Sequence, residues 1–362
     1  MGLKNTIFGN FFKDKTVLIT GHTGFMGSYL SIWLNELGAN VIGYALPPYT
    51  EKDNFVVTNL EEKLVSIIGD IRDFEKVNET VKQNKPDIIF HLAAQPIVRK
   101  SYLIPKETYD VNVGGTVNIF EAFRNNESSR VLINVTTDKV YENQEWIWGY
   151  RENDRLGGFD PYSSSKACSD LITSAYSQSF FNLNGLNSKK IVSSVRSGNV
   201  IGGGDWQEDR LIPDCMRAIE KKEEICIRNP EFIRPWQLVL EPIRGYLMLA
   251  MKMWEDKEKF SGAWNFGPDN NCIFCVNDIV NKIINYMGKG EYKCLTPQEC
   301  DDLHETKVLM LDNSKSFKYL GWEPAIDIDD TVKLLCEWYM EKDVTYDFDV
   351  KQIDTYLKLI KH

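Results

Sequence analysis

The stretch TVLITGHTGFMG, residues 16–27, decides the fold. Its first five residues, 16–20, are short, apolar and partly β-branched, which predicts a buried parallel strand. Glycines follow at positions 21, 24 and 27, and helical spacing continues to Gly38. A strand, a glycine turn and a helix in this order are typical of a dinucleotide-binding βαβ unit. The bare backbone can approach a pyrophosphate, and the helix N–H groups face that anion.

The turn provides the first group of expected cofactor-binding residues, which are Gly21, His22, Thr23, Gly24, Phe25, Met26 and Gly27. The second expected strand ends in Gly43-Tyr44-Ala45-Leu46, with neither an acidic residue for a ribose diol nor an arginine for a 2′-phosphate. This position therefore does not choose between NAD and NADP. Asp70 and Ile71 follow the third strand, where Asp70 fits either an adenine contact or a turn.

Short apolar runs alternate with helical stretches through the first half of the chain. The further expected strands are 40–44, 64–68, 87–90, 131–135 and 190–195, with helices at 74–82, 108–124 and 162–181. This alternation predicts an α/β fold with a Rossmann-like, doubly wound parallel sheet.

The alternation of strands and helices ends after about residue 197. Beyond it, helices are still expected at 210–220, 242–254, 277–286 and 328–340. We predict an NAD-binding domain over 1–198, with 240–258 returning to it. Residues 199–239 and 259–362 are predicted to form a smaller mixed α/β lobe that binds the substrate.

Composition narrows the class of protein. The 362 residues carry 42 basic and 52 acidic side chains, a net charge of −10, which argues against binding nucleic acid through bulk electrostatics. No apolar run approaches the roughly 20 residues of a membrane span, and the start is too polar for a signal peptide. Eight scattered cysteines do not form a disulfide framework. We therefore expect a cytoplasmic protein with neither nucleic acid nor membrane as partner.

A metal centre is not expected. The four histidines, including His22 and His91, are widely spaced. The Cys272–Cys275 pair begins like a zinc motif, but Cys294, Cys300 and His304 do not supply a close second pair. Reduced thiols are the preferred interpretation.

The candidate catalytic residues lie beyond the expected fifth strand. Tyr162 and Lys166 form a Y-x-x-x-K pair on one helix face, where the ammonium group favours the phenolate form of the tyrosine. Thr137 ends the strand, and its hydroxyl is expected beside Tyr162. Asp138 and Lys139 follow as an acid and a potential base.

With these residues in place, the chain resembles the extended short-chain dehydrogenase/reductases, and within them the nucleotide-sugar 4,6-dehydratases. The resemblance rests on GHTGFMGSYL (21–30), GDIRD (69–73), HLAAQPIVRKSY (91–102), TTDKVYEN (136–143), DPYSSSKACSDL (160–171) and RSGNVIGGGDWQEDRLIP (196–213). The Asp138-Lys139 pair is similar to the CDP-glucose branch, and it replaces the Asp-Glu pair of the dTDP-glucose relatives.

The resemblance implies an NAD-dependent lyase that returns its cofactor unchanged. Tyr162, helped by Lys166 and Thr137, would take the proton of the sugar 4-hydroxyl, and Asp138 would protonate the departing 6-hydroxyl. Lys139 or Glu142 would take the C5 proton. The same resemblance adds Ala93 to the cofactor site and makes the partner a nucleotide sugar in a homodimeric enzyme. It assigns substrate binding to Asn199, Arg210 and Arg234.

Two other functions fit parts of the sequence. A nucleotide-sugar 4-epimerase shares the glycine turn and the Tyr/Lys pair but needs no Asp-Lys pair. A cofactor-sensing regulatory protein on the same fold commonly lacks the Tyr/Lys pair. The long connection 138–160, with Trp146, Trp148 and Tyr150, is expected either to cover the reacting sugar or to pack on the smaller lobe.

Overall fold

The computed structural model describes residues 7–181, 189–269, 274–296, 303 and 306–360. Within them a seven-stranded sheet runs in the order β11-β6-β5-β4-β1-β2-β3, and every strand pairs parallel to its neighbours. The strands are β1 (Thr16–Thr20), β2 (Asn40–Ala45), β3 (Val65–Ile68), β4 (Ile88–His91), β5 (Val131–Val135), β6 (Ile191–Arg196) and β11 (Gly262–Asn265). The prediction of a doubly wound parallel sheet is confirmed.

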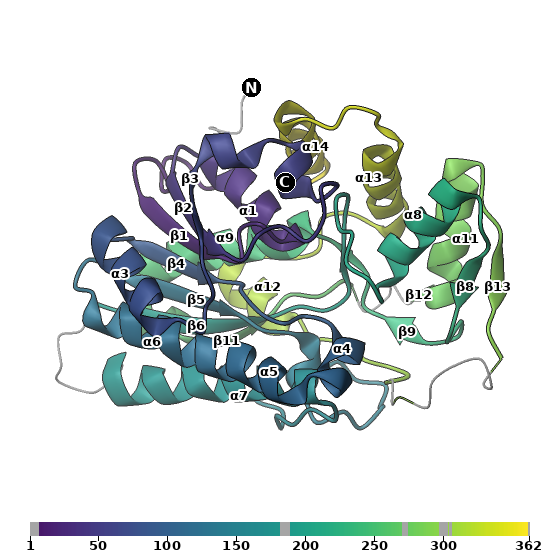
Figure 1. Ribbon diagram of the computed structural model, residues 1–362. Helices are drawn as coiled ribbons and strands as arrows, with labels where there is room; N and C mark the ends of the chain where they lie inside the picture. Colours follow the sequence, from purple (N-terminus) through teal and green to yellow (C-terminus); the bar gives the residue numbers. More distant parts are fainter. Residues whose placement is uncertain (1–6, 182–188, 270–273, 297–302, 304–305, 361–362) are drawn as a thin grey trace.

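Helices cover both faces of the sheet (Figure 1). One face carries α3 (Phe74–Asn84), α6 (Gly115–Asn125) and α7 (Pro161–Tyr176), and the other carries α1 (Phe25–Glu36), α9 (Leu240–Glu255) and α14 (Tyr346–Leu359). Strand β5 is buried along its whole length because it lies between these two layers. A buried parallel strand accounts for the unbroken apolar runs in the sequence.

The helix expected over 108–124 is interrupted. The chain forms α5 (Pro105–Tyr109), a π-helical turn over Asp110–Gly114, and then α6. At Gly115 a side chain would place its Cβ 2.6 Å from the Ile71 side chain. The glycine therefore permits a close approach between α6 and the loop after β3.

A smaller group of elements packs around a second core, at the right of Figure 1. Its helices are α8 (Leu211–Lys221), α11 (Val276–Met287) and α13 (Ile328–Met340). Its strand pairs are β8 (Ile225–Ile227) with β13 (Tyr292–Cys294) and β9 (Ile233–Arg234) with β12 (Phe274–Cys275). The remaining short elements are α2 (Asn54–Val57), α4 (Val98–Leu103), β7 (Val200–Ile201), β10 (Gln237–Leu238), α10 (Lys257–Phe260) and α12 (Ser314–Leu320).

Three elements of the C-terminal part lie elsewhere than the sequence predicts. Strand β11 pairs with β6 in the main sheet, α12 contacts β11 and α9, and α14 packs on α1, where the Tyr356 and Trp33 rings meet edge to face at 6.0 Å. All three fall in the range 259–362, which the sequence assigned to the smaller lobe. The β11 sequence, GAWN, has only two apolar residues, and α14 buries only a narrow stripe. The domain division stays a prediction, with these three elements moved to the sheet.

No helix in the described part of the chain combines the length and apolar character that crossing a bilayer requires.

Candidate active site

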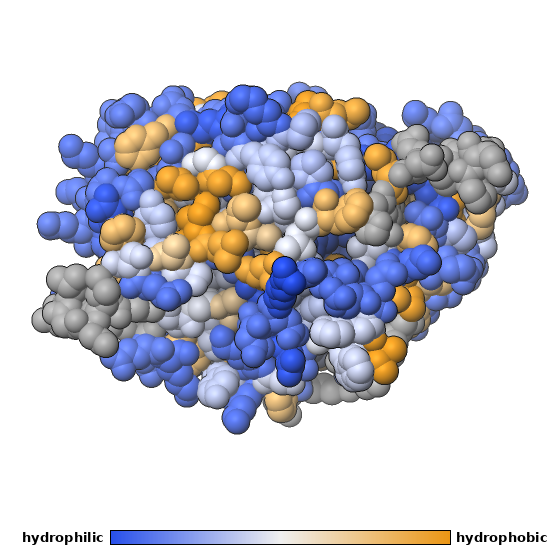
Figure 2. Space-filling model, turned by 90° about the horizontal axis from the view of Figure 1, so that it is seen from below, coloured by the Kyte–Doolittle hydropathy of each residue, from blue (hydrophilic) through white to orange (hydrophobic). Residues whose placement is uncertain are grey.

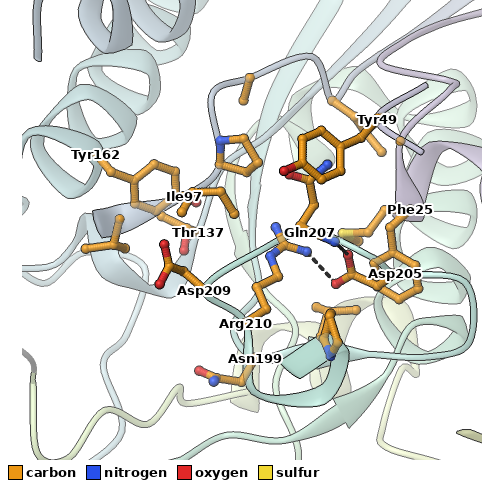
Figure 3. A pocket seen from close by; sticks show the side chains of 18 of the residues that line it. Phe25, Tyr49, Ile97, Thr137, Tyr162, Asn199, Asp205, Gln207, Asp209 and Arg210 are labelled. Atoms are coloured by element: carbon orange, nitrogen blue, oxygen red, sulfur yellow. Dashed lines mark hydrogen bonds and ion pairs between the residues drawn. The ribbon is translucent and has the colours of Figure 1, made fainter. Parts of the chain in front are cut away.

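A cavity of about 670 Å³ opens at the carboxyl ends of the sheet strands (Figure 3). Its lining comes from the glycine turn, from residues that follow β2 to β6, and from the smaller group of elements, including Arg228 and Arg234. Open α/β sheets bind their ligands at this edge, so the fold and the cavity mark the same place.

The glycine turn has the geometry that a pyrophosphate requires. Gly21 has a φ of +82°, and a Cβ there would lie 2.9 Å from the backbone nitrogen of Ala93. A Cβ at Gly27 would lie 2.1 Å from the carbonyl oxygen of Gly21. Gly24 precedes α1 without a side-chain cap, which leaves the first N–H groups of the helix available to an anion. The turn therefore fits a dinucleotide.

Nearly all the predicted cofactor residues line this cavity: Gly21, Thr23, Gly24, Phe25, Met26, Gly27, Asp70, Ile71 and Ala93. The Asp70 carboxylate is also held by Arg72 at 2.6 Å, and this hydrogen bond lowers the pKa of Asp70.

His22 is the exception and requires a correction, because its side chain is not among the described residues that line the cavity. The ring is buried, its Nε2 lies 2.9 Å from the Ser66 hydroxyl, and it meets Phe55 edge to face. A Cβ at Gly43 would fall 2.2 Å from the ring. Burial lowers the pKa of His22 to about 4, so the neutral imidazole serves packing.

The Tyr162–Lys166 pair enters the cavity from the first turns of α7. Asp160 fixes the start of that helix by accepting a hydrogen bond from the Ser163 N–H at 2.9 Å. The Lys166 ammonium donates to the Val135 carbonyl oxygen at 3.0 Å, and burial lowers the pKa of Lys166 to about 8. Both side chains are thereby held at the end of β5.

Two opposing effects act on the Tyr162 phenol. Burial raises its pKa to about 12, whereas the hydrogen bond with Thr137 and the positive charge of Arg210 act in the opposite direction. Figure 3 shows Tyr162, Thr137 and Arg210 around one cavity. The phenol therefore depends on nearby donors and cations to lose its proton.

Asp138 is a buried carboxylate in the same cavity. One oxygen, Oδ1, accepts a hydrogen bond from the Thr137 hydroxyl at 3.0 Å, and the backbone N–H donates to the Ser197 carbonyl at 3.2 Å. Its other oxygen, Oδ2, is buried without a hydrogen-bond partner among the described residues. A Cβ at Gly198 would lie 1.8 Å from that oxygen, so the glycine provides its space. Asp138 therefore brings to the cavity lining a carboxyl group with one oxygen that has no hydrogen-bond partner among the described residues.

The structure separates the two candidates for the C5 base. Lys139 is half-buried and lines the cavity. Glu142 is not part of the described lining and binds Arg155 at 2.7 Å instead. The geometry therefore favours Lys139 over Glu142.

The three residues predicted to bind substrate also line the cavity. Asn199 lies in the left-handed region with a φ of 41°. Arg210 donates to Asp205 at 2.8 Å, the dashed contact in Figure 3. Arg234 donates to the Ile233 carbonyl at 3.0 Å, and its guanidinium lies over the Phe232 ring.

The cavity lining also includes polar residues that the sequence did not single out, among them Arg99, Asp205, Asp209 and Arg228. Arg99 lies on α4, Arg228 follows β8, and the two acids lie in the run 202–210. For Arg99 and the two acids, their position in the resembling motifs was the available signal, but only the tertiary structure shows which of these side chains reach the cavity.

The aromatic side chains of the connection 138–160 pack against other residues of the protein and do not line the cavity. Tyr141 and Tyr150 stack at 5.0 Å, Tyr150 bridges to Leu311, and the Tyr141 hydroxyl donates to Asn265. Neither Trp146 nor Trp148 belongs to the described lining of the cavity. For these aromatic residues the structure favours packing over a cover for the sugar.

Among the described residues, no group of three His, Cys, Asp or Glu side chains is arranged to hold a metal ion. Cys275 precedes α11, and Cys294 is exposed on β13. Cys272, Cys300 and His304 lie outside the described residues.

The fold and this set of side chains define a member of the extended short-chain dehydrogenase/reductase class. The family model described as GDP-mannose 4,6 dehydratase matches residues 18–335. The chain therefore belongs to the GDP-mannose 4,6 dehydratase family.

Individual relatives agree with this assignment. The CDP-glucose 4,6-dehydratase of Salmonella typhimurium is 46% identical over 331 residues, which are 91% of this chain and 92% of that protein. The dTDP-glucose 4,6-dehydratase of Bacillus anthracis, solved in complex with NAD, superposes with a TM-score of 0.74 at 21% identity, covering 91% and 97% of the two chains. DesIV, a dTDP-glucose 4,6-dehydratase from Streptomyces venezuelae with NAD and TYD bound, gives a TM-score of 0.76 at 21% identity, covering 90% and 97%.

Proposed function

We propose that this protein converts CDP-D-glucose to CDP-4-dehydro-6-deoxy-D-glucose and water. The observation that carries the proposal is the buried Asp138 carboxyl group with its unpartnered Oδ2, in one cavity with Thr137 and Tyr162. A 4-epimerase needs the tyrosine but no acid of this kind. The 46% identity to a CDP-glucose 4,6-dehydratase supports the choice of substrate.

The cofactor we propose is NAD, held on the glycine turn and along the cavity residues from Asp70 to Ala93. The turn fits its pyrophosphate because side chains at Gly21 and Gly27 would fill the space next to the backbone. When bound, NAD supplies a site that accepts a hydride from the sugar and later returns it.

The tyrosine starts the reaction by removing the proton of the sugar 4-hydroxyl. The Thr137 hydroxyl and Arg210 stabilise the negative charge of the phenolate. We assign a further stabilising role to the Lys166 ammonium, which lies one turn along the same helix. Loss of this proton lets the 4-hydroxyl become a ketone as the C4 hydrogen leaves as hydride. The ketone in turn acidifies the proton at C5.

Elimination then needs one acid and one base. We assign the proton that leaves with the 6-hydroxyl to Asp138, and removal of the C5 proton to a neutral Lys139. The C–O bond at C6 breaks as the C5–C6 double bond forms, and the oxygen departs as water. Hydride return to C6 and protonation of C5 complete the product.

Substrate contacts follow from the same cavity. We propose that Asn199, Arg210 and Arg234 bind the diphosphate, since arginine offers a fork that suits phosphate oxygens. A homodimer and a cytoplasmic location remain predictions. Exposed apolar side chains on α5 and α7, among them Tyr109 and Leu171, support the first. Figure 2 shows the face seen from below Figure 1, where apolar patches lie between hydrophilic ones.

A panel of CDP-, dTDP-, GDP- and UDP-hexoses, analysed by mass spectrometry for the loss of one water, tests the proposal. We expect loss of water from CDP-glucose and none with Tyr162→Phe. With Asp138→Asn the sugar should still be oxidised while water loss slows by about 10²-fold or more. A product of unchanged mass and inverted C4 configuration would show an epimerase instead.

A further inference from the structure

A second tyrosine, on α4, lies in the wall of the cavity. Tyr102 is half-buried and is among the residues that line the cavity. Its hydroxyl oxygen is buried and has no hydrogen-bond partner among the described residues. A buried polar group of this kind is unfavourable, because it has lost its bonds to water and gained none from the protein. In a residue that lines a ligand cavity, such a hydroxyl indicates that the ligand provides the partner.

Two interactions place Tyr102 next to the start of α7, the helix that carries Tyr162. Ser101, its neighbour in the chain, accepts a hydrogen bond from the backbone N–H of Tyr162 at 3.1 Å. Asp160, which caps α7, lies close enough for its charge to raise the pKa of Tyr102 further, beyond the larger effect of burial. Tyr102 therefore lies at the end of the cavity where the reacting sugar is expected.

The polar side chains beside Tyr102 already have other partners. Oδ1 of Asp160 accepts a hydrogen bond from the Ser163 N–H at 2.9 Å, and its Oδ2 accepts one from the Ser163 hydroxyl at 2.5 Å. The Ser101 hydroxyl donates to the Val98 carbonyl at 2.6 Å. These bonds hold the first turns of α7 and α4. A partner on the ligand satisfies the Tyr102 hydroxyl and leaves all of them intact.

The surroundings make Tyr102 a hydrogen-bond donor and not a second base. Burial raises the pKa of both phenols. For Tyr162, the hydrogen bond with Thr137 and the charge of Arg210 oppose this effect. For Tyr102, the charge of Asp160 adds to it. The Tyr102 hydroxyl therefore keeps its proton at neutral pH and can donate a hydrogen bond to an acceptor oxygen.

The chemistry of the reaction narrows the choice of acceptor. In the proposed mechanism the C4 oxygen of the hexose faces Tyr162, and the C6 oxygen is protonated by Asp138. The hydroxyls at C2 and C3 keep their bonds throughout, so they are available for recognition. We propose that Tyr102 donates a hydrogen bond to one of these two hydroxyls and that this bond selects the hexose. The inference rests on the proposed function for its ligand.

Tyr102→Phe removes this hydroxyl and keeps the ring. In the NAD-loaded Tyr162→Phe protein, which should not turn over, calorimetric titrations with CDP-glucose and with CDP separate binding of the hexose from binding of the nucleotide. Adding Tyr102→Phe should weaken CDP-glucose binding by about tenfold, because one hydrogen bond is lost. It should leave CDP binding unchanged, since CDP carries no hexose.

Two deoxy analogues of CDP-glucose, lacking the hydroxyl at C2 or at C3, identify the acceptor. The analogue without the acceptor should bind about tenfold more weakly to the Tyr162→Phe protein and be insensitive to Tyr102→Phe. The other analogue should keep the tenfold difference. Tyr176→Phe is the matched control, because its hydroxyl donates to Glu121 at 2.7 Å and Tyr176 is not part of the described lining. It should bind CDP-glucose normally, and thermal melting confirms that each variant is folded.

With Tyr162 intact, Tyr102→Phe should raise KM by about tenfold and change kcat by less than about threefold, because a hydroxyl that does not react is bound equally in the ground state and the transition state. Unchanged CDP-glucose binding, or equal weakening of CDP and CDP-glucose, would overturn the inference. So would two deoxy analogues that both respond to Tyr102→Phe as CDP-glucose does. The proposed function fails separately, when CDP-glucose binds with this dependence on Tyr102 but loses no water.

Discussion

At the residue scale, the catalytic pair works only when one of its two side chains carries a proton and the other does not. Tyr162 acts as a base without its proton, and Lys166 stabilises the phenolate only while it keeps its own. Burial places the pKa of Tyr162 at about 12 and that of Lys166 at about 8. The active form is therefore the one-proton form of the pair with the proton on Lys166, which interconverts with the form that carries it on Tyr162.

This distribution fixes the pH dependence of the enzyme. The pair loses its first proton near the lower pKa, so kcat/KM should rise about tenfold per pH unit below about pH 8 and then level off. Lys166→Met leaves Tyr162 as the only titrating group of the pair. The rise of kcat/KM with pH should therefore shift to higher pH by more than about one unit. Steady-state rates between about pH 5.5 and 9.5 measure the shift.

Lys190→Met is the control, because burial also lowers the pKa of Lys190 to about 8 while its ammonium donates to backbone carbonyls in the last turn of α6 and to that of Asn126 just after it. A rise of kcat/KM that does not move in Lys166→Met would contradict the assignment of the pair.

Gly198 tests the position of the proposed acid. In Gly198→Ala the new Cβ would meet Oδ2 of Asp138 at 1.8 Å, so the carboxyl group must move. We expect kcat for dehydration to fall by about 10²-fold or more, with cofactor binding retained. Gly114→Ala adds a Cβ in open space and should leave the rate unchanged. An unaffected rate in Gly198→Ala would remove Asp138 from the mechanism.

At this scale the sequence predicted most of the side chains that the structure brings to the cavity. Tyr162, Lys166, Thr137 and Asp138 could be predicted because motif spacing and strand ends bring them to one edge of the sheet. His22 could not be placed, because its ring direction is decided by the space beside Gly43. The sequence could not show that Arg99 and Asp209 lie together, because their contact joins residues more than a hundred positions apart.

At the element scale, α7 is fastened to the sheet by a buried ion pair. Arg196 at the end of β6 binds Asp170 on α7 through two hydrogen bonds of 2.8 Å, and both side chains are at most 4% exposed. The same guanidinium donates to the Tyr141 hydroxyl at 2.7 Å. This ion pair fixes the position of α7, which carries Tyr162 and Lys166, relative to the sheet.

Breaking this pair should be costly, because a buried charge is left uncompensated. We predict that Asp170→Asn lowers the free energy of unfolding by about 3–5 kcal/mol. Asp110→Asn is the matched surface change, since Asp110 pairs with Lys106 and the two side chains are 45% and 88% exposed. It should cost at most about 1 kcal/mol. Equal losses in a urea titration of the two variants would contradict this account.

Elements differ in how well the sequence predicts them. The limits of β1, β5 and α13 agree with the structure because their apolar pattern is complete within each segment. Strand β11 was not predicted, because its sequence, GAWN, has only two apolar residues and the strand is stabilised by pairing with β6. The π-helical turn before α6 was not predicted either; the close approach of Gly115 to Ile71 beside it is a tertiary contact that the local pattern does not show.

At the scale of the whole molecule, the C-terminal helix joins the two cores. On α14, Asp349 is fully buried and accepts a hydrogen bond from the Trp338 indole on α13 at 3.1 Å. Burial raises its pKa from 3.8 to about 7, against the opposing hydrogen bonds of Asn54 and Trp338. The folded protein therefore holds one proton more than the unfolded chain between these two values, and its stability falls as pH rises from about 4 to 7.

Asp349→Asn removes this ionisation. The melting temperature of the variant should exceed that of the natural protein by more at pH 8 than at pH 5, because only the natural protein has to bury a charge or take up a proton at high pH. Calorimetry at the two pH values measures the difference. A variant with the same pH dependence as the natural protein would show that Asp349 ionises normally.

The central claim is that a sugar bound in this cavity loses a hydride from C4 and receives the same hydride back at C6. The most direct measurement uses CDP-glucose that carries deuterium at C4 and locates the label in the product by nuclear magnetic resonance. We predict a dehydrated product that retains the deuterium at C6, and no product with Tyr162→Phe. Dehydrated product without the label, or an undehydrated sugar with the label still at C4, would contradict the account.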